Sequence, residues 1–269
     1  MSNNFRPAAV AGSFYPESAA LLAHDVGRML SAARNTKTGR PKAIIAPHAG
    51  YVYSGPIAAS VYAPLAALRG EIRRVVLLGP THRVAVNGLA LPSCAAFVTP
   101  LGLVPVDGQA ITCIEDLPQV VLSDAAHAQE HSLEVQLPFL QVVLGDFSLL
   151  PLAVGHASAA EVAEVLERLW GGDETLIVVS SDLSHYLPYD AARKSDAASA
   201  AHILALDPHL DHQQACGATP VNGLLLAARR HGLRAQQIDL RNSGDTAGDK
   251  SRVVGYGAFS FSNGASDVA

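Results

Sequence analysis

The sequence lacks the runs of basic residues with which nucleic-acid-binding proteins neutralise phosphates. Lys and Arg together number 19 against 24 Asp and Glu, and the formal net charge is -5. No run of Lys or Arg is longer than a pair. We therefore expect no nucleic-acid partner.

Long apolar segments are also missing. No window reaches the roughly 18 apolar residues that a membrane-spanning helix needs. The first residues, Met1 to Pro7, lack the positive start and apolar stretch of a signal peptide. We therefore expect no membrane partner and a cytoplasmic location.

Cysteine is scarce as well. The three cysteines, Cys94, Cys113 and Cys216, are odd in number and far apart along the chain. This spacing excludes a disulfide framework and a paired Cys-x-x-Cys zinc ribbon. Any cysteine chemistry must therefore come from single thiols.

Apolar residues, by contrast, are abundant. Hydrophobic residues make up 49% of the chain and charged residues 16%, a balance typical of a folded globule. A length of 269 residues suits one large domain better than two small ones. We expect a single domain over residues 1–269, with the ends 1–5 and 262–269 frayed.

Short apolar runs alternate with longer stretches of helical period. Runs rich in Val, Ile and Leu predict strands buried on both faces of a sheet, the clearest at Ala43–Ala46, Arg74–Leu78, Leu149–Val154 and Leu176–Val179. Helices are predicted over Ser18–Ala33, Pro56–Leu68, Ser132–Leu144, Ser158–Trp170, Tyr189–Leu206 and Pro220–His231. A late pair of strands, near Gln236–Leu240 and Arg252–Phe261, is expected at an edge. The alternation predicts an α/β fold, a three-layer α/β/α sandwich with a mainly parallel or mixed central sheet.

Three of the predicted strands are followed within a few residues by a histidine. These histidines are His48, His82 and His185. Because ligands of open α/β sheets bind outside the carboxyl ends of the strands, the three imidazoles are expected to meet in one crevice. The alternative is that they are surface or hydrogen-bonded histidines, which is how we interpret seven further histidines, His24, His127, His156, His202, His209, His212 and His231.

Two further residues, Asp182 and His131, are candidates for the site. Asp182 lies on the same turn as His185 and is expected to orient an imidazole, to bind a ligand directly, or to cap the following turn. His131 precedes Ser132, a candidate helix cap, and a neutral imidazole at a helix start suits proton transfer or a hydrogen bond to a ligand. An incidental histidine in a capping turn is the alternative.

Cys216 comes just before a predicted helix that has proline in its first turn. A helix N-terminus can acidify such a thiol, and a thiolate is a soft metal ligand or a nucleophile. A buried, inert cysteine is the alternative. Two imidazoles and a thiolate suit iron, copper or zinc better than calcium or magnesium.

These residues and their neighbours resemble the Memo family, whose bacterial members are named AmmeMemoRadiSam system protein B. The matching motifs run in order over nearly the whole chain. They are Arg6–Pro16, Ala46–Tyr51, Gly79–His82, Glu130–Phe139, Ser180–His185, Cys216–Gly217, Asn242–Asp245 and Val253–Tyr256.

The resemblance implies a fold similar to that of the class III extradiol dioxygenases (LigB-like), which are non-haem iron enzymes. It also implies that His48, His82 and Cys216 form the metal-binding set, with Asp182 and His185 lining the same pocket. A cysteine then stands where the dioxygenases have a carboxylate ligand, and this departure argues against ring cleavage.

Three functions remain open at this point. The first is a metal-dependent oxidoreductase that uses Fe(II) or Cu, with Zn as another metal, and in which His131, His185 and Asp182 serve the reaction. The second is a non-catalytic module that binds a peptide or protein in the dioxygenase-like cleft, and the third is hydrolysis with Cys216 as nucleophile. Expected partners are a small molecule or peptide and, as the resemblance implies, AMMECR-like and radical-SAM proteins of the same system.

Overall fold

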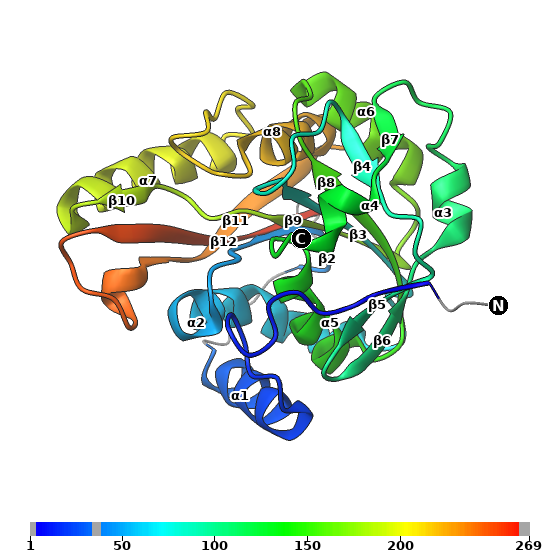
Figure 1. Cartoon of the computed structure of the whole chain (residues 1–269). Helices are drawn as coiled ribbons and strands as arrows, with labels where there is room; N and C mark the ends of the chain where they lie inside the picture. Colours follow the sequence, from blue (N-terminus) through cyan, green and yellow to red (C-terminus); the bar gives the residue numbers. More distant parts are fainter. Residues whose placement is uncertain (1–3, 34–38, 264–269) are drawn as a thin grey trace, which may run out of the picture.

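The centre of the computed structural model, which describes residues 4–33 and 39–263, is a large mixed β-sheet. Its strands are β2 (Pro41–Ala46), β3 (Arg74–Pro80), β4 (Leu89–Leu91), β7 (Val120–Leu122), β8 (Ser148–Val154), β9 (Thr175–Ser180), β10 (His185–Leu187), β11 (Leu233–Asn242) and β12 (Val253–Asn263). Their order is β10-β12-β2-β9-β3-β8-β4-β7, and β11 also pairs with β12 (Figure 1). The four apolar runs of the sequence form the parallel centre, β2-β9-β3-β8.

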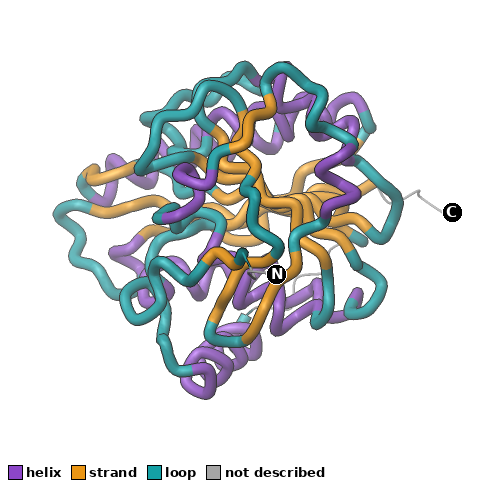
Figure 2. The backbone as a smooth tube through the Cα atoms, turned by 45° about the vertical axis from the view of Figure 1, so that its right-hand side comes forward, coloured by secondary structure: helices purple, strands orange, loops and turns teal. Residues whose placement is uncertain are grey.

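Helices cover both faces of this sheet. On one face lie α1 (Ala19–Ala32), α2 (Tyr51–Tyr62) and α5 (Leu137–Leu144), and on the other α6 (Ala159–Leu169), α7 (Tyr189–Leu204) and α8 (Ala218–Arg230) (Figure 1). A hydrophobic core lies on each face of the sheet, and alternate residues of β2 point into the two cores. Ile44 packs in one core, and Ala43 and Ile45 pack in the other. Figure 2 shows the strands running through the middle with helices around them. The predicted three-layer α/β/α sandwich is confirmed.

The late pair of strands is present, but only β11 is at the edge. β12 lies inside the sheet, antiparallel to β11 on one side and to β2 on the other, with Phe259 opposite Ile45. Phe259 and Phe261 are fully buried because helices cover the sheet at this point. The prediction that both strands lie at an edge is therefore wrong for β12.

The predicted helices are present, with different limits at two places. The helix expected over Pro56–Leu68 begins earlier, as α2, and continues as the 3-10 helix η1 (Ala63–Leu68). The helix expected over Ser132–Leu144 divides into the 3-10 turn η2 (Glu134–Gln136) and α5. Ser158 caps α6 as the sequence indicates, since its hydroxyl accepts from the backbone N–H of Glu161.

The chain also contains short elements that the sequence did not predict. A second sheet joins β1 (Phe5–Arg6), β5 (Ala96–Thr99) and β6 (Gly102–Pro105), while α3 (Gly108–Thr112), α4 (Asp124–Ala128) and the turn η3 (Ser243–Asp245) connect other elements. Phe5 and the pair Ser262 and Asn263 belong to strands although they fall within the ends predicted to fray. Asn4 is also described, and its side-chain amide donates to the hydroxyl of Ser93 at 3.2 Å. The remaining residues of those predicted ends, 1–3 and 264–269, lie outside the described residues.

Within residues 4–33 and 39–263, no helix combines the length and the apolar character needed to cross a membrane.

The arrangement of the sheet decides where function can lie. β9 is parallel to both of its neighbours, β2 and β3, so the carboxyl ends of these three strands lie side by side. The loops leaving these ends carry most of the predicted site residues.

Candidate metal centre

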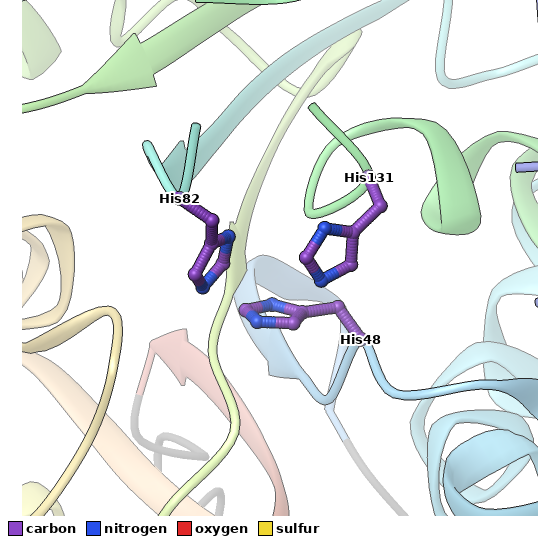
Figure 3. Close-up of side chains that lie close together, drawn as sticks. All are labelled: His48, His82 and His131. Atoms are coloured by element: carbon purple, nitrogen blue, oxygen red, sulfur yellow. The ribbon is translucent and has the colours of Figure 1, made fainter. Parts of the chain in front are cut away.

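Three histidines converge beyond the carboxyl ends of the parallel strands. His48 follows β2, His82 follows β3, and His131 lies in the loop between α4 and η2. One ring nitrogen from each of the three lies within 4.8 Å of those of the other two. Figure 3 shows the three side chains pointing toward one another from separate segments. Of the three histidines predicted to converge, His48, His82 and His185, the first two are in this group, and His131 is its third member.

The three imidazoles contact one another closely but differ in exposure. The ring centroids of His82 and His131 are 4.6 Å apart and nearly stacked, whereas His48 meets both edge-on at 5.2 and 5.5 Å. His48 is 2% exposed, while the His82 side chain is 29% exposed. The cluster therefore has a buried floor at His48 and opens to solvent at His82.

Cys216 lies beside the buried floor of the cluster. Its Sγ is 3.2 Å from Nε2 of His48 and accepts a hydrogen bond from the backbone N–H of Asp182 at 3.3 Å. The next residue, Gly217, packs so tightly that an added Cβ would lie 2.7 Å from Cβ of Ser181. Glycine therefore lets the start of α8 approach the end of β9, which brings the sulfur to His48.

The other predicted residues lie around this group rather than in it. The Asp182 carboxylate accepts from the backbone N–H of His48 at 2.7 Å, and not from an imidazole. Its backbone, not its carboxylate, contacts Cys216. His185 begins β10 and lies outside the three-histidine group, although its charge would act on His48. Asp182 therefore fixes the loop that carries His48.

The carboxylate that does hold an imidazole is Glu130, which the sequence reasoning missed. Its side chain is 1% exposed; one carboxylate oxygen accepts from the backbone N–H of His82 at 2.6 Å, and the other lies 2.9 Å from Nδ1 of His82. Burial raises the pKa of Glu130, but the hydrogen bonds from His82 and Ser132 outweigh it and bring the pKa to about 2. An acidic residue directly before His131 was the signal that could have found it.

The loop of Glu130 contributes three more buried polar side chains at alternate positions, Ser132, Glu134 and Gln136, all fully buried. Ser132 does not cap a helix as predicted, because its hydroxyl donates to the carbonyl of Pro80 at 2.9 Å. Tertiary hydrogen bonding has taken the place of the local cap.

The N-terminal segment around Val10 to Tyr15 packs beside His131. Glu134 pairs with Arg6, and it also accepts from the backbone N–H of Val10 at 3.0 Å and from the hydroxyl of Tyr15. The ring of Phe14 consequently lies against His131, with centroids 4.7 Å apart. The buried Glu134 thus holds an aromatic side chain over the cluster.

Burial keeps two imidazoles of this cluster, His48 and His131, neutral. It lowers the pKa of His48 well below its usual value, and the neighbouring imidazoles lower it further. Burial likewise lowers the pKa of His131 to about 4, although Glu130 opposes the shift. Neutral imidazoles offer lone pairs, which is the form that binds a metal ion.

The acidic groups next to His48 hold their protons more tightly than usual. Burial raises the pKa of Asp182 to about 7. Burial and then the Asp182 carboxyl raise the pKa of Cys216 to about 12, so the helix N-terminus does not acidify this thiol as predicted. A thiol of this kind is a poor nucleophile by itself, and it becomes a thiolate when a metal ion replaces its proton.

The donor set fits a transition metal. The three imidazole nitrogens form one group, and the Cys216 sulfur lies 3.2 Å from His48 but outside that group. Nitrogen and sulfur atoms of these kinds are borderline-soft donors that suit iron, copper or zinc. The two buried acids next to them, Asp182 and Cys216, have raised pKa values, and the Cys216 thiol carries no charge at neutral pH without a cation. A bound cation would be compensated by loss of the thiol proton.

Comparisons with known proteins agree with the motifs. A family model described as Memo-like protein matches residues 6–260. A MEMO1 family protein of Aquifex aeolicus is 38% identical over 93% of this chain and 97% of the relative. One from Ignicoccus hospitalis is 37% identical over 95% of this chain and 98% of the relative.

Among solved structures, an uncharacterized protein from Escherichia coli K12 has a similar fold. It matches with a TM-score of 0.50 over 80% of this chain and 98% of that chain, at 15% sequence identity. At this identity the likeness concerns the fold alone.

Proposed function

This chain belongs to the Memo family, and from that premise we propose that its histidine cluster is a transition-metal site that serves an oxidoreductase reaction. The observation that carries the proposal is the convergence of nitrogen atoms from His48, His82 and His131 within 4.8 Å of one another. The sulfur of Cys216, 3.2 Å from His48, supports it.

His48, His82 and Cys216 are the proposed metal ligands. Nε2 of His48 and Sγ of Cys216 adjoin each other, and His82 reaches the same space from the neighbouring loop. Two nitrogens and one thiolate favour Fe(II) or copper, with zinc as a further candidate, over the hard cations magnesium and calcium. A bound iron or copper ion supplies one-electron chemistry and a position for oxygen or a small substrate.

The remaining residues bind and orient. His131 stacks on His82, where its ring can hydrogen-bond a substrate or pass a proton to it. His185 is the second proposed proton-transfer residue, and Asp182 lines the same pocket and holds the loop of His48. Phe14 shields His131 from one side, which limits access of water.

Metal analysis tests this proposal directly. Protein purified without chelator, then offered Fe(II), Cu(I) or Zn(II), is expected to hold one ion per chain. His48→Ala and Cys216→Ala are expected to lose it while circular dichroism and thermal unfolding show an intact fold. Cys94→Ala is the matched control, because Cys94 is a buried thiol of the apolar core.

Two results would contradict the proposal. Wild-type protein that binds none of the three metals excludes a metal site. Full retention of metal by Cys216→Ala removes this sulfur from the ligand set and leaves His131 as the third ligand, since its nitrogen already lies within 4.8 Å of the other two.

A second candidate function is recognition of a peptide or protein at the same cleft. Tyr186, directly after His185, is 62% exposed, and its φ of 58° lies in a region that costs a tyrosine free energy. The guanidinium of Arg252 lies 5.1 Å from the centre of its ring. An exposed aromatic side chain held in this way suits a contact with a partner. Failure to bind metal together with an intact fold would favour this function.

A further inference from the structure

We infer that buried side chains beneath the cluster fix the imidazole proton of both His48 and His82 on Nδ1, so that both Nε2 lone pairs face the metal space before any ion arrives. Ser180 is the positioning residue for His48, and Glu130 is the positioning residue for His82. The inference deepens the proposed metal site and rests on it for its functional meaning.

The hydrogen bonds of Ser180 determine the proton of His48. The Ser180 hydroxyl lies 2.6 Å from the carbonyl oxygen of Ser132, which can only accept, so its single proton points there. The amide Nε2 of Gln136 donates to the same hydroxyl at 2.8 Å. Ser180 therefore has no proton left for Nδ1 of His48 at 2.9 Å, and Nδ1 must be the donor.

The orientation of the Gln136 amide is itself fixed. Its Nε2 also donates to the carbonyl of Pro47 at 2.9 Å, and its Oε1 accepts from the hydroxyl of Tyr62 at 2.8 Å. A flipped amide would place its oxygen against two acceptors. Gln136 and Tyr62 are fully buried, so water cannot substitute for these bonds.

Glu130 determines the proton of His82. Its two carboxylate oxygens accept from the backbone N–H groups of His82 at 2.6 Å and of Ser132 at 2.9 Å. Both oxygens thus act as acceptors toward fixed backbone donors, which orients Oε1 as an acceptor for the imidazole as well. Nδ1 of His82, 2.9 Å from Oε1, must therefore donate.

His131 is held less firmly than the other two imidazoles. Its Nδ1 lies 3.3 Å from the same Glu130 oxygen that already accepts from His82 and Ser132. His48 and His82 each have a contact of 2.9 Å at Nδ1, whereas the contact at Nδ1 of His131 is longer. Short bonds of this kind are typical of metal-binding histidines, which supports His48 and His82 as the two imidazole ligands.

The tautomers can be measured in the metal-free protein. Long-range proton–nitrogen correlation NMR on protein with isotopically labelled histidine distinguishes a protonated Nδ1 from a protonated Nε2. His48→Gln and His82→Gln assign the two signals by their loss. We expect both rings of the wild-type protein to carry the proton on Nδ1, whatever the metal.

Ser180→Ala should change His48 alone. Removing the acceptor is expected to mix the Nε2–H form into the His48 signal, leave His82 unchanged, and weaken Zn²⁺ binding about 10- to 100-fold. Ser180→Thr keeps a hydroxyl and should keep the Nδ1–H form. Ser199→Ala is the matched control, since this buried hydroxyl donates to the carbonyl of Ser195 within α7.

The outcomes separate this inference from the proposed function. A wild-type His48 or His82 with its proton on Nε2, or a His48 tautomer that Ser180→Ala leaves unchanged, overturns the inference even if metal binds. Nδ1–H on both rings without binding of Fe(II), Cu(I) or Zn(II) leaves the inference standing and defeats the proposed function.

Discussion

The two ends of the same parallel strands bear polar groups in opposite ways. At the carboxyl ends, the side chains of Glu130, Ser180 and Gln136 are buried and hydrogen-bonded. Glu130 accepts from the backbone N–H of Ser132, and the amide of Gln136 donates to the hydroxyl of Ser180. At the amino ends, polar groups line an open cavity of about 370 Å³, where the ammonium of Lys42 donates to the carbonyls of Gly172 and Thr175.

The difference shows which end is built for chemistry. A buried polar group costs free energy unless its partners are complete, so a buried network fixes the positions of its members. Exposed charges such as Arg40 and Glu71 pair in water and can separate at little cost. The buried network at the carboxyl ends can therefore hold reactive atoms in one geometry.

The largest expected contrast is between two ion pairs. Arg6→Met leaves Glu134 buried without its cation and should lower the free energy of unfolding by about 3–5 kcal/mol. Arg40→Met, at the amino ends, removes the exposed pair with Glu71 and should cost about 0–1 kcal/mol. Urea unfolding at neutral pH measures both. Equal losses in the two variants would remove the contrast.

A glycine substitution should sharpen the comparison next. In Gly79→Ala the new methyl group would lie 2.7 Å from Oγ of Ser132 and push the loop of His131 away from β3. We expect a loss of about 1–3 kcal/mol in stability together with weaker metal binding. Gly27→Ala, in α1 with open space around it, should instead stabilise by about 0.5–1 kcal/mol. Chemical denaturation and metal titration of both variants check this; a stable, metal-binding Gly79→Ala would contradict it.

The smallest expected effect concerns acid stability at the amino ends. Burial raises the pKa of Asp107, but hydrogen bonds from Arg74, Ala110 and Ser148 outweigh it, and the net pKa is lowered. A carboxyl whose pKa is lower in the folded state stabilises the protein above its unfolded pKa, and this contribution disappears as the pH falls through the folded value.

Asp107→Asn should therefore cost about 1–2 kcal/mol at neutral pH. The difference from the wild type should shrink below about pH 4, where unfolded carboxyls take up protons. Thermal unfolding across this pH range is the measurement. A difference that does not change with pH would show that Asp107 acts through its shape alone.

Much of the fold could be predicted because its signals are local. Runs such as Val75–Leu78 read as buried strands wherever they occur, and the capping box at Ser158 marks its helix without help from the rest of the chain. The position of β12 inside the sheet could not be predicted, since it depends on pairing with β2, far away in the sequence. The strands β4, β7 and β10 have three residues each, which is too short for a recognisable alternation of apolar and polar residues.

The site divides in the same way. His48 and His82 were found because each follows a strand end, which is a local signal. Glu130, Ser180 and Gln136 were missed because they act through hydrogen bonds between segments that are far apart in the sequence. Local rules about helix ends predicted that Ser132 caps a helix and that a helix N-terminus acidifies Cys216. The Ser132 hydroxyl instead donates to Pro80, and burial raises the pKa of Cys216.

The atoms of the candidate centre come from widely separated parts of the chain, since His48 and Cys216 are 168 positions apart and Arg6 and Glu134 are 128 positions apart. Loops of that size close slowly, after nearby helices and hairpins have formed. During synthesis the ribosome delivers the imidazoles well before the sulfur. We therefore expect the centre to be assembled late, and nascent chains that end ahead of α8 to hold its histidines without its thiol.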